Sequence, residues 1–421
     1  MHAVETLVVG AGQAGLAVSR CLTEFGADHV VTERGRVAER WRTARWDSLR
    51  LLTPNWMSRL PFWAYTGADP DGYMPAPELV RYLEGYAGSF TAPVHEHTTV
   101  ELIEAAGSGL RVVTDQGTWL ARNVVMATGT ENRPYLPSAA SGIDPEIHQL
   151  PAARYCGPDQ VPGGGVLVVG ASASGVQIAD ELRRAGRPVV ISVGRHARLP
   201  RCYQGRDILC WMDRAGVLGQ TIDQVHDARS ARRAPSMQLS GRGRPVGLDA
   251  LAAGGVRLAG RLVAADGRRL SFADDLPATI GGAQARMERL LRTIEGYIAR
   301  SGEGAGPADP PAPFTAPAGP VRLDLRRAGI STVIWATGYQ PAYPWLRVPV
   351  LDRHGQIAHS RGVTSVPGLY VLGLKFQYRR NSTFVDGVAS DARFVATHLM
   401  MRRMNARARA ASGPDACALS A

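Results

Sequence analysis

The stretch LVVGAGQAG at residues 7–15 ends an apolar, strand-like run and opens an amphipathic segment. That order of strand, glycine-rich turn and helix is typical of a dinucleotide-binding βαβ unit. Gly10 permits the tight turn, Gly12 lets the backbone approach a pyrophosphate, and Gly15 lets the helix pack closely on the strand. The next strand ends in Glu33, about 18 residues further on. We therefore predict a nucleotide-binding unit over residues 4–33.

A second stretch of the same kind, VLVVGASASG, occupies residues 166–175. Ser172 replaces the middle glycine, but serine is small and can donate a hydrogen bond to phosphate. The strand that follows ends near Arg195, where the first unit has Glu33. A carboxylate there accepts hydrogen bonds from a ribose 2′-hydroxyl, whereas an arginine pairs with a 2′-phosphate. The chain is thus predicted to bind two different dinucleotides, the second being NADPH, with Arg198 and Arg201 as alternative phosphate ligands.

Length and composition narrow the class of protein. A chain of 421 residues is too long for one compact core, so two domains are expected. The net charge of +11 comes almost wholly from arginines spread along the chain, with Lys375 as the only lysine. This spread does not favour a nucleic-acid interface, and no apolar run is long enough to cross a membrane. We expect the protein to be cytoplasmic, with a homodimer as a candidate assembly.

The five cysteines form no Cys-x-x-Cys pair and no metal-ligand spacing. Such a scattered, odd-numbered set is typical of a reducing compartment. It argues against a dithiol–disulfide reductase, which needs two neighbouring cysteines. We therefore predict no metal site and no disulfide chemistry.

Two short turns, Ala-Thr-Gly at 127–129 and at 336–338, each follow one glycine-rich unit in the sequence. This internal duplication predicts an α/β fold of two Rossmann-like dinucleotide-binding domains. The first domain must be discontinuous, because a further strand and helix over 368–403 follow the second. The expected bounds are 1–160 with 321–404 for the first domain and 161–320 for the second. The tail over 405–421 is expected to be disordered.

The chain resembles the class B flavoprotein monooxygenases, the group that includes flavin-containing monooxygenases and YUCCA-type enzymes. The resemblance rests on both glycine-rich stretches, on the Trp/Arg-rich segment over 40–51 and on both Ala-Thr-Gly turns. It covers nearly the whole length. It implies FAD in the first domain, NADPH in the second, and O2 and a small organic molecule as substrates. The implied reaction is N-, S- or activated-carbon oxygenation through a C4a-hydroperoxyflavin.

The resemblance and the motifs together assign site residues. Asn55 is a candidate for stabilising the oxygenating flavin, with a purely structural loop role as the alternative. The residues expected to bind the two cofactors are Gly10, Gly12, Gln13, Gly15, Glu33, Arg34, Trp41, Asp47, Thr128, Gly129, Gly170, Ser172, Ser174, Gly175, Arg195, Thr337, Gly338 and Asn381. Two other functions stay open: an NADPH reductase or oxidase that uses FAD without oxygenating a substrate, and a non-catalytic nucleotide-binding module.

Overall fold

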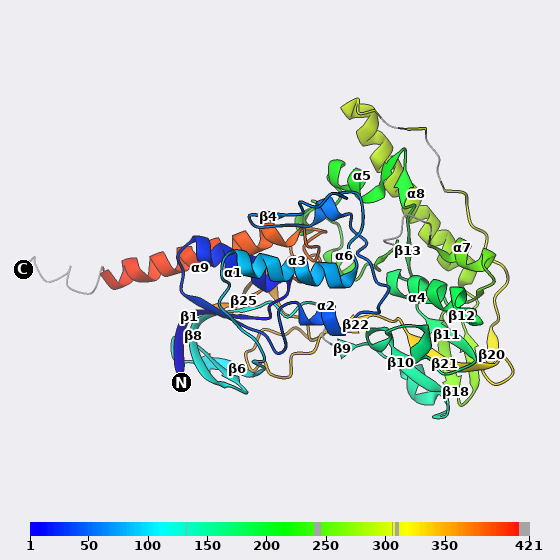
Figure 1. Cartoon of the computed structure of the whole chain (residues 1–421), viewed down its shortest axis with the longest axis horizontal. Coiled ribbons are helices and arrows are strands. Elements are labelled where there is room, and N and C mark those ends of the chain that lie inside the picture. Colours follow the sequence, from blue (N-terminus) through cyan, green and yellow to red (C-terminus); the bar gives the residue numbers. More distant parts are fainter. Residues whose placement is uncertain (132, 240–245, 305, 308–310, 412–421) are drawn as a thin grey trace, which may run out of the picture.

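The structure is a computed structural model that describes residues 1–131, 133–239, 246–304, 306–307 and 311–411. The described chain forms two α/β units that lie side by side, with a helical extension above the second (Figure 1). Each unit is built around one of the two glycine-rich stretches. In each, a strand, the turn, a helix and a second strand follow one another in the sequence as predicted.

The first unit is a sheet in which β1 pairs in parallel with β2 on one side and with β8 on the other. The order β23-β24-β25-β8-β1-β2-β5 runs across it, and β6 and β7 extend β8 as an antiparallel meander. Its strands are β1 (His2–Val9), β2 (His29–Thr32), β5 (Val94–His95), β6 (Val100–Ala106), β7 (Gly109–Thr114), β8 (Gly117–Met126), β23 (His359–Ser360), β24 (Val363–Thr364) and β25 (Leu369–Val371).

Helices cover one face of this sheet, as Figure 1 shows for α1 (Gln13–Glu24), α3 (Ala76–Ser89) and α9 (Val388–Ala411). Leu16 and Leu22 of α1, Leu83 of α3 and Val395 of α9 are all buried in one core cluster with Val8 of β1. The opposite face is covered by the β6–β7 meander and by residues 343–357, which bury Leu7 and Val124. Burial on both faces explains the apolar run of Leu7, Val8 and Val9 at the end of β1.

The second unit repeats the arrangement around β11 (Gly165–Val169), which lies between β12 (Val189–Ser192) and β21 (Ile330–Trp335) in parallel. The strand order is β10-β21-β11-β12-β17, with β10 over His148–Pro151 and β17 over Arg257–Ala259. Helices α4 (Ala173–Arg184), α7 (Leu248–Ala253) and the start of α8 (Leu276–Ser301) cover one face. A small sheet of β18 (Leu262–Asp266), β19 (Arg269–Phe272) and β20 (Arg322–Asp324) covers the other.

The remaining elements are short and lie in the connections. They are α2 (Glu39–Thr43), β3 (Arg59–Leu60), β4 (Trp63–Ala64), β9 (Arg133–Pro134), β13 (Ala197–Arg198), β14 (Cys202–Tyr203), β15 (Arg206–Asp207), α5 (Ile208–Arg214), α6 (Ala228–Arg232), β16 (Met237–Gln238) and β22 (Tyr339–Gln340). The 3-10 turns are η1 (Asn55–Met57), η2 (Ser138–Gly142), η3 (Ala152–Arg154), η4 (Pro158–Gln160) and η5 (Ile222–Gln224). A separate apolar cluster joins α5, the end of α8 and Met57.

The second unit is inserted into the first, but its bounds differ from the predicted ones. Strand β10, expected in the first domain, pairs with β21, and β21 pairs with β11. Both strands therefore belong to the second sheet, although sequence placed 148–160 and 321–335 in the first domain. The chain crosses between the units at β9 and β22, which pair with each other and lie between the two units in Figure 1.

The C-terminal prediction also needs correction. Helix α9 continues to Ala411, so the expected disordered tail is wrong for residues 405–411. The rest of that tail, 412–421, lies outside the described residues.

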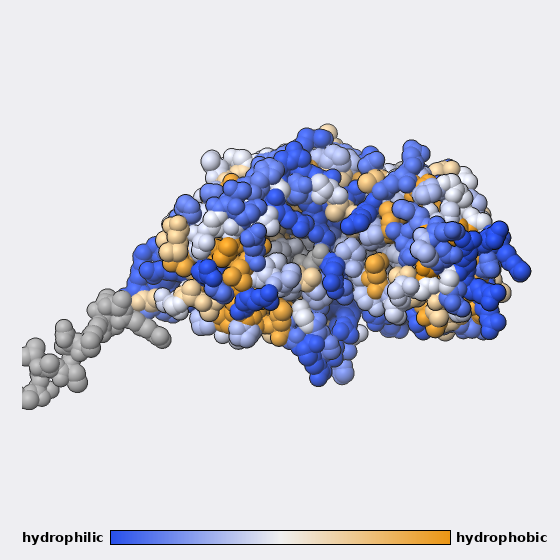
Figure 2. Space-filling model, turned by 90° about the horizontal axis from the view of Figure 1, so that it is seen from below, coloured by the Kyte–Doolittle hydropathy of each residue, from blue (hydrophilic) through white to orange (hydrophobic). Residues whose placement is uncertain are grey.

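No helix in the described part of the chain is long and apolar enough to cross a membrane. The face in Figure 2 is mostly hydrophilic, with its apolar residues in several separate groups.

Candidate functional site

The two glycine-rich turns have nearly the same backbone geometry. Gly10 has a φ of 105° and Gly170 a φ of 113°, in the region that only glycine adopts readily. A Cβ on Gly10 would lie 2.9 Å from the oxygen of Ala127, and one on Gly170 would lie 2.4 Å from that of Ala336. Each turn therefore packs directly against the Ala-Thr-Gly turn of its own unit, as the duplication suggested.

The third glycine of each stretch holds the helix against the turn. A Cβ on Gly15 would lie 1.8 Å from the oxygen of Gly10, and one on Gly175 would lie 1.8 Å from that of Gly170. These contacts are with backbone, which cannot move aside without changing the turn. Gly15 and Gly175 thus shape the site without lining it.

The middle position of each stretch is where the two turns differ in side chain. Gly12 and Ser172 are the residues that precede α1 and α4, with φ and ψ of −84° and −174° and of −82° and −172°. Any residue adopts these angles, so serine at 172 causes no strain. A Cβ on Gly12 would meet nothing within 4 Å, and the Ser172 hydroxyl does not cap its helix. Both turns therefore leave space and N–H donors for a phosphate at a helix N-terminus.

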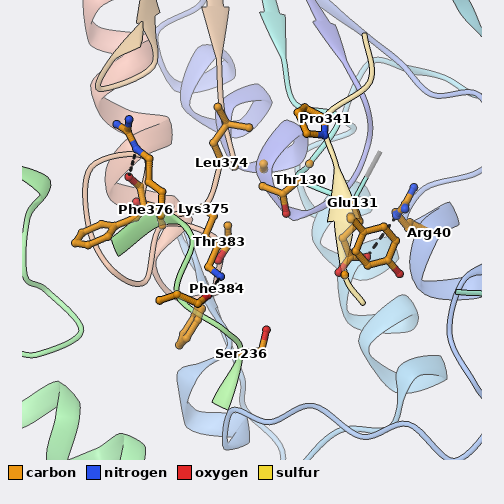
Figure 3. A pocket seen from close by; sticks show the side chains of 18 of the residues that line it. Arg40, Thr130, Glu131, Ser236, Pro341, Leu374, Lys375, Phe376, Thr383 and Phe384 are labelled. Carbon is orange, nitrogen blue, oxygen red and sulfur yellow. Dashed lines mark hydrogen bonds and ion pairs between the residues drawn. The ribbon is translucent and has the colours of Figure 1, made fainter. Parts of the chain in front are cut away.

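Both turns open into one cavity of about 2040 Å³. A site for one small ligand usually measures about 300–1,000 Å³, so this cavity has room for two dinucleotides. Figure 3 shows Lys375, Phe376, Thr383 and Phe384 on one side of it and Arg40, Thr130 and Glu131 on the other. The predicted residues that line it are Gly10, Gly12, Gln13, Glu33, Arg34, Trp41, Thr128, Gly129, Gly170, Ser172, Ser174, Arg195, Thr337 and Gly338.

Glu33 is fixed at the end of β2 by the first turn itself. Its carboxylate accepts hydrogen bonds from the backbone N–H of Ala11 at 2.8 Å and of Gly35 at 3.2 Å. It borders the cavity and is partly exposed to it, so it is placed to accept from a ribose hydroxyl. The cradle of Gly10, Gly12 and Glu33 fits the adenosine and pyrophosphate part of a dinucleotide.

The Trp/Arg-rich segment after β2 closes over this first turn. The Trp41 indole donates to Oε1 of Gln13 at 3.3 Å, and the Arg45 guanidinium lies 4.6 Å from the Trp41 ring. Arg45 also pairs with Glu131 at 2.8 Å, which comes just after the Ala-Thr-Gly turn of the first unit. The segment is thereby tied to both edges of the first nucleotide site.

The three arginines after β12 have different positions. Arg201 is buried and forms an ion pair with Asp207, and Arg198 pairs with Asp249 at 2.8 Å. Arg195 is exposed on the cavity wall, and within the described chain it donates a hydrogen bond only to the backbone oxygen of Arg233, at 2.7 Å. Of the three predicted phosphate ligands, Arg195 is therefore the one that is not held by a carboxylate.

Besides Gly15 and Gly175, three predicted site residues are not on the cavity wall: Asp47, Asn55 and Asn381. Asn55 is buried, donates to the Asp69 oxygen and accepts from the Met74 N–H, both at 2.8 Å, so it serves its own loop. Asp47 is exposed in a segment that packs on the second unit. Asn381 is buried and does not line the cavity, although Arg380 and Ser382 do.

Several cationic residues on the cavity wall were not predicted. Lys375, Arg232 and Arg286 all line it. Shielding from bulk water and the nearby charge of Arg195 lower the pKa values of Lys375 and Arg286, and desolvation lowers that of Arg232. His359 lines the same wall, and burial together with Arg232 lowers its pKa to about 4, so it is neutral at pH 7. The one signal in the sequence for Lys375 is that it is the sole lysine.

Comparison with known proteins places this geometry. A curated "Uncharacterized oxidoreductase CzcO-like" from Geobacillus kaustophilus is 33% identical over 95% of this chain and 99% of its own. The chain belongs to the CzcO-like oxidoreductases. The family model "Pyridine nucleotide-disulphide oxidoreductase" matches residues 7–202 of this CzcO-like chain. That match spans the first glycine-rich turn, the second, and the strands between them.

Two further comparisons concern the monooxygenase resemblance. A solved "Flavin-containing monooxygenase from Stenotrophomonas maltophilia" covers 96% of this CzcO-like chain and 100% of its own, with a TM-score of 0.65 and 23% identity. "Probable indole-3-pyruvate monooxygenase YUCCA1" of Arabidopsis thaliana is 33% identical over 42% of this chain and 44% of its own. The predicted fold and the resemblance to the class B flavoprotein monooxygenases are confirmed. This CzcO-like protein is an oxidoreductase.

Proposed function

We propose that this protein is an NADPH- and O2-dependent FAD monooxygenase that inserts one oxygen atom into a small organic substrate. The observation that carries the proposal is one cavity into which both glycine-rich turns open, with a strand-end residue of opposite charge beside each turn. Glu33 borders it at the first turn and Arg195 at the second. FAD is assigned to the first turn and NADPH to the second, as the charges at the two strand ends favour.

When bound, the flavin supplies the redox chemistry, and the protein binds and orients the reactants and excludes water. The helix N-termini at Gly12 and Ser172 would bind the two pyrophosphates, and Glu33 would accept a hydrogen bond from the adenosine ribose of FAD. Loop residues from both units close the cavity between them. The Trp41–Gln13 hydrogen bond keeps one such loop over the first turn.

The cysteines support oxygenation over disulfide reduction. None of the four cysteines in the described chain, Cys21, Cys156, Cys202 and Cys210, lines the cavity. A dithiol–disulfide reductase needs two neighbouring cysteines beside its flavin. Two similar proteins are named as monooxygenases, one of them for indole-3-pyruvate, and substrates of that kind, small and organic, are what we propose for this chain.

The decisive experiment follows the flavin spectrum. The purified protein should be yellow, and NADPH should bleach it under anaerobic conditions. Mixing the reduced protein with O2 in a stopped-flow instrument should show a transient absorbing species before the oxidised spectrum returns. A colourless protein that binds no flavin contradicts the proposal. If the oxidised spectrum returns without a transient species in the presence of every substrate tested, the protein is an NADPH reductase or oxidase.

The coenzyme preference has its own test. Arg195→Ala should weaken NADPH binding about tenfold or more, since a charge-assisted hydrogen bond to a phosphate is worth about 1.5–3 kcal/mol. NADH binding should change less than about twofold. Arg326→Gln is a matched control because that exposed arginine lies outside the cavity wall. Equal losses for both coenzymes would show that Arg195 does not bind the 2′-phosphate.

A further inference from the structure

One short segment of the second unit reaches across the cavity to the first. It comprises residues 229–234, which we call the bridging segment. Arg229 contacts His354, and Arg232 donates to the backbone oxygen of Phe376 at 3.5 Å. Both partners belong to the first unit. The bridging segment is therefore a place where the two units meet at the edge of the cavity.

Two cations, one from each unit, hold the backbone of the bridging segment. Arg195 of the second unit donates to the oxygen of Arg233 at 2.7 Å. Lys375 of the first unit donates to the oxygen of Ala234. These carbonyls belong to adjacent residues, whose Cα atoms are about 3.8 Å apart. The guanidinium and the ammonium are therefore near neighbours, and the charge of Arg195 lowers the pKa of Lys375.

The two cations have no carboxylate partner within the described residues. Desolvation and the nearby charge of Arg195 lower the pKa of Arg286. Within the described residues, Arg286 too donates only to a backbone oxygen, that of His196. Three positive charges thus border one part of the cavity, held by neutral carbonyls. Carbonyl oxygens compensate a cation less well than an anion does. This part of the cavity is suited to a group of high negative charge with several acceptor oxygens, such as a phosphate monoester.

We propose that Lys375 of the first unit binds the 2′-phosphate of the coenzyme together with Arg195 of the second. This inference rests on the proposed function, because it assumes that NADPH occupies the second turn. It assigns part of the coenzyme specificity to a residue outside the second unit. The phosphate takes the place of the Arg233 and Ala234 carbonyls as acceptor. The coenzyme thereby links the two units, which NADH, lacking the phosphate, cannot do at this point.

The sole lysine of the chain gives a direct test. The wild-type protein is treated with an acetylating reagent, N-hydroxysuccinimidyl acetate, and the acetylation rate of Lys375 is measured by mass spectrometry. The probes are 2′,5′-ADP, which carries the 2′-phosphate, and 5′-AMP, which lacks it. Saturating 2′,5′-ADP should slow acetylation of Lys375 at least fivefold, while 5′-AMP leaves it nearly unchanged. The N-terminal amine serves as an internal reference for the reagent.

Calorimetric binding of the same two probes measures the energetic effect. Lys375→Gln should weaken 2′,5′-ADP about tenfold and 5′-AMP less than twofold, whereas Lys375→Arg should retain most of the binding. Arg326→Gln is again the control for removing one positive charge. Bound flavin and the thermal midpoint show whether each variant is folded. If Lys375→Gln does not fold, Lys375→Arg and the wild-type acetylation measurement still decide the matter.

The outcomes separate this proposal from the one it rests on. The role of Lys375 would be overturned if Lys375→Gln binds both probes unchanged and 2′,5′-ADP does not slow acetylation of Lys375. If Arg195→Ala then still loses affinity for 2′,5′-ADP alone, NADPH remains the coenzyme. Equal affinity of the wild-type protein for both probes would instead remove the NADPH assignment itself. Selective loss in both variants supports both proposals.

Discussion

The glycine-rich turns of the first and second units share one backbone geometry and differ in a few side chains. In both, a strand from later in the chain pairs in parallel with the strand that enters the glycine-rich turn. In both, the third glycine packs on the first at the same close distance. The differences are Gly12 against Ser172 and Glu33 against Arg195. Backbone geometry therefore makes each unit a nucleotide site, and the side chains determine which nucleotide it takes.

The largest effect should come from filling the close helix–turn contact in each unit separately. Gly15→Ala and Gly175→Ala each place a methyl group 1.8 Å from a backbone oxygen, so the turn must shift. We expect the amount of flavin bound per Gly15→Ala protein to fall at least tenfold. Gly175→Ala should keep its flavin and lose at least tenfold in affinity for 2′,5′-ADP. Flavin absorbance per protein and calorimetry measure these losses, and a loss of flavin in both variants would mean the units do not act separately.

Removing the charge at the end of β2 should have the next largest effect. Glu33→Gln weakens the acceptor for the Ala11 and Gly35 N–H groups and for a ribose hydroxyl. A hydrogen bond to a charged group is worth about 1.5–3 kcal/mol, so flavin should bind about tenfold more weakly. Titration of the apoprotein with FAD measures this. Glu101→Gln, an exposed glutamate of β6 outside the cavity wall, is the control, and an equal loss there would deny Glu33 a specific role.

Acid should release the flavin, because two buried histidines of the first unit lose their stabilising contribution as the pH falls. Two histidines of the first unit have pKa values lowered chiefly by burial, His29 and His359, the latter to about 4. The unfolded chain takes up these protons below about pH 6.5 and the folded chain does not, so stability present above that pH is lost as it falls. The second unit has one such residue, His196. Flavin fluorescence, followed from pH 7 to 4, measures the release, and unchanged flavin binding over this range would contradict the prediction.

A variant at one of these histidines sharpens the acid prediction. His359→Asn keeps an acceptor for the Gly362 N–H but cannot take up a proton. The midpoint of acid release should move to lower pH by a few tenths of a unit. An unchanged midpoint would show that His359 does not contribute to acid sensitivity.

The smallest effects are expected from exchanging the middle residues of the two turns. Gly12 and Ser172 have matching φ and ψ angles, so Gly12→Ser and Ser172→Gly should both fold normally. Ser172→Gly removes one hydroxyl donor and should weaken 2′,5′-ADP about two- to tenfold, the range of a single net hydrogen bond. The change in thermal midpoint should be within about two degrees. A large loss of stability in either variant would contradict the equivalence of the two turns.

The sequence predicted what is determined locally. A glycine-rich turn, its flanking strand and helix, and the residue at the next strand end all lie within about 30 residues, so Glu33 and Arg195 could be placed. The unit boundaries could not, because the pairing of β10 with β21 joins segments far apart in the chain. The directions of Asp47, Asn55 and Asn381 depend on loop packing. Lys375 reaches the second site only through the relative placement of the units, which no local pattern records.

The insertion has a consequence for how the chain is made. Ribosomes extend a chain by about 5–20 residues per second, and domains generally fold as they emerge. The glycine-rich turn of the first unit is synthesised before the second unit, whereas α9, whose Val388 and Val395 cover α1, is synthesised after it. The whole second unit emerges in between. The first unit is therefore completed last, and the apolar face of α1 stays uncovered until α9 has been synthesised.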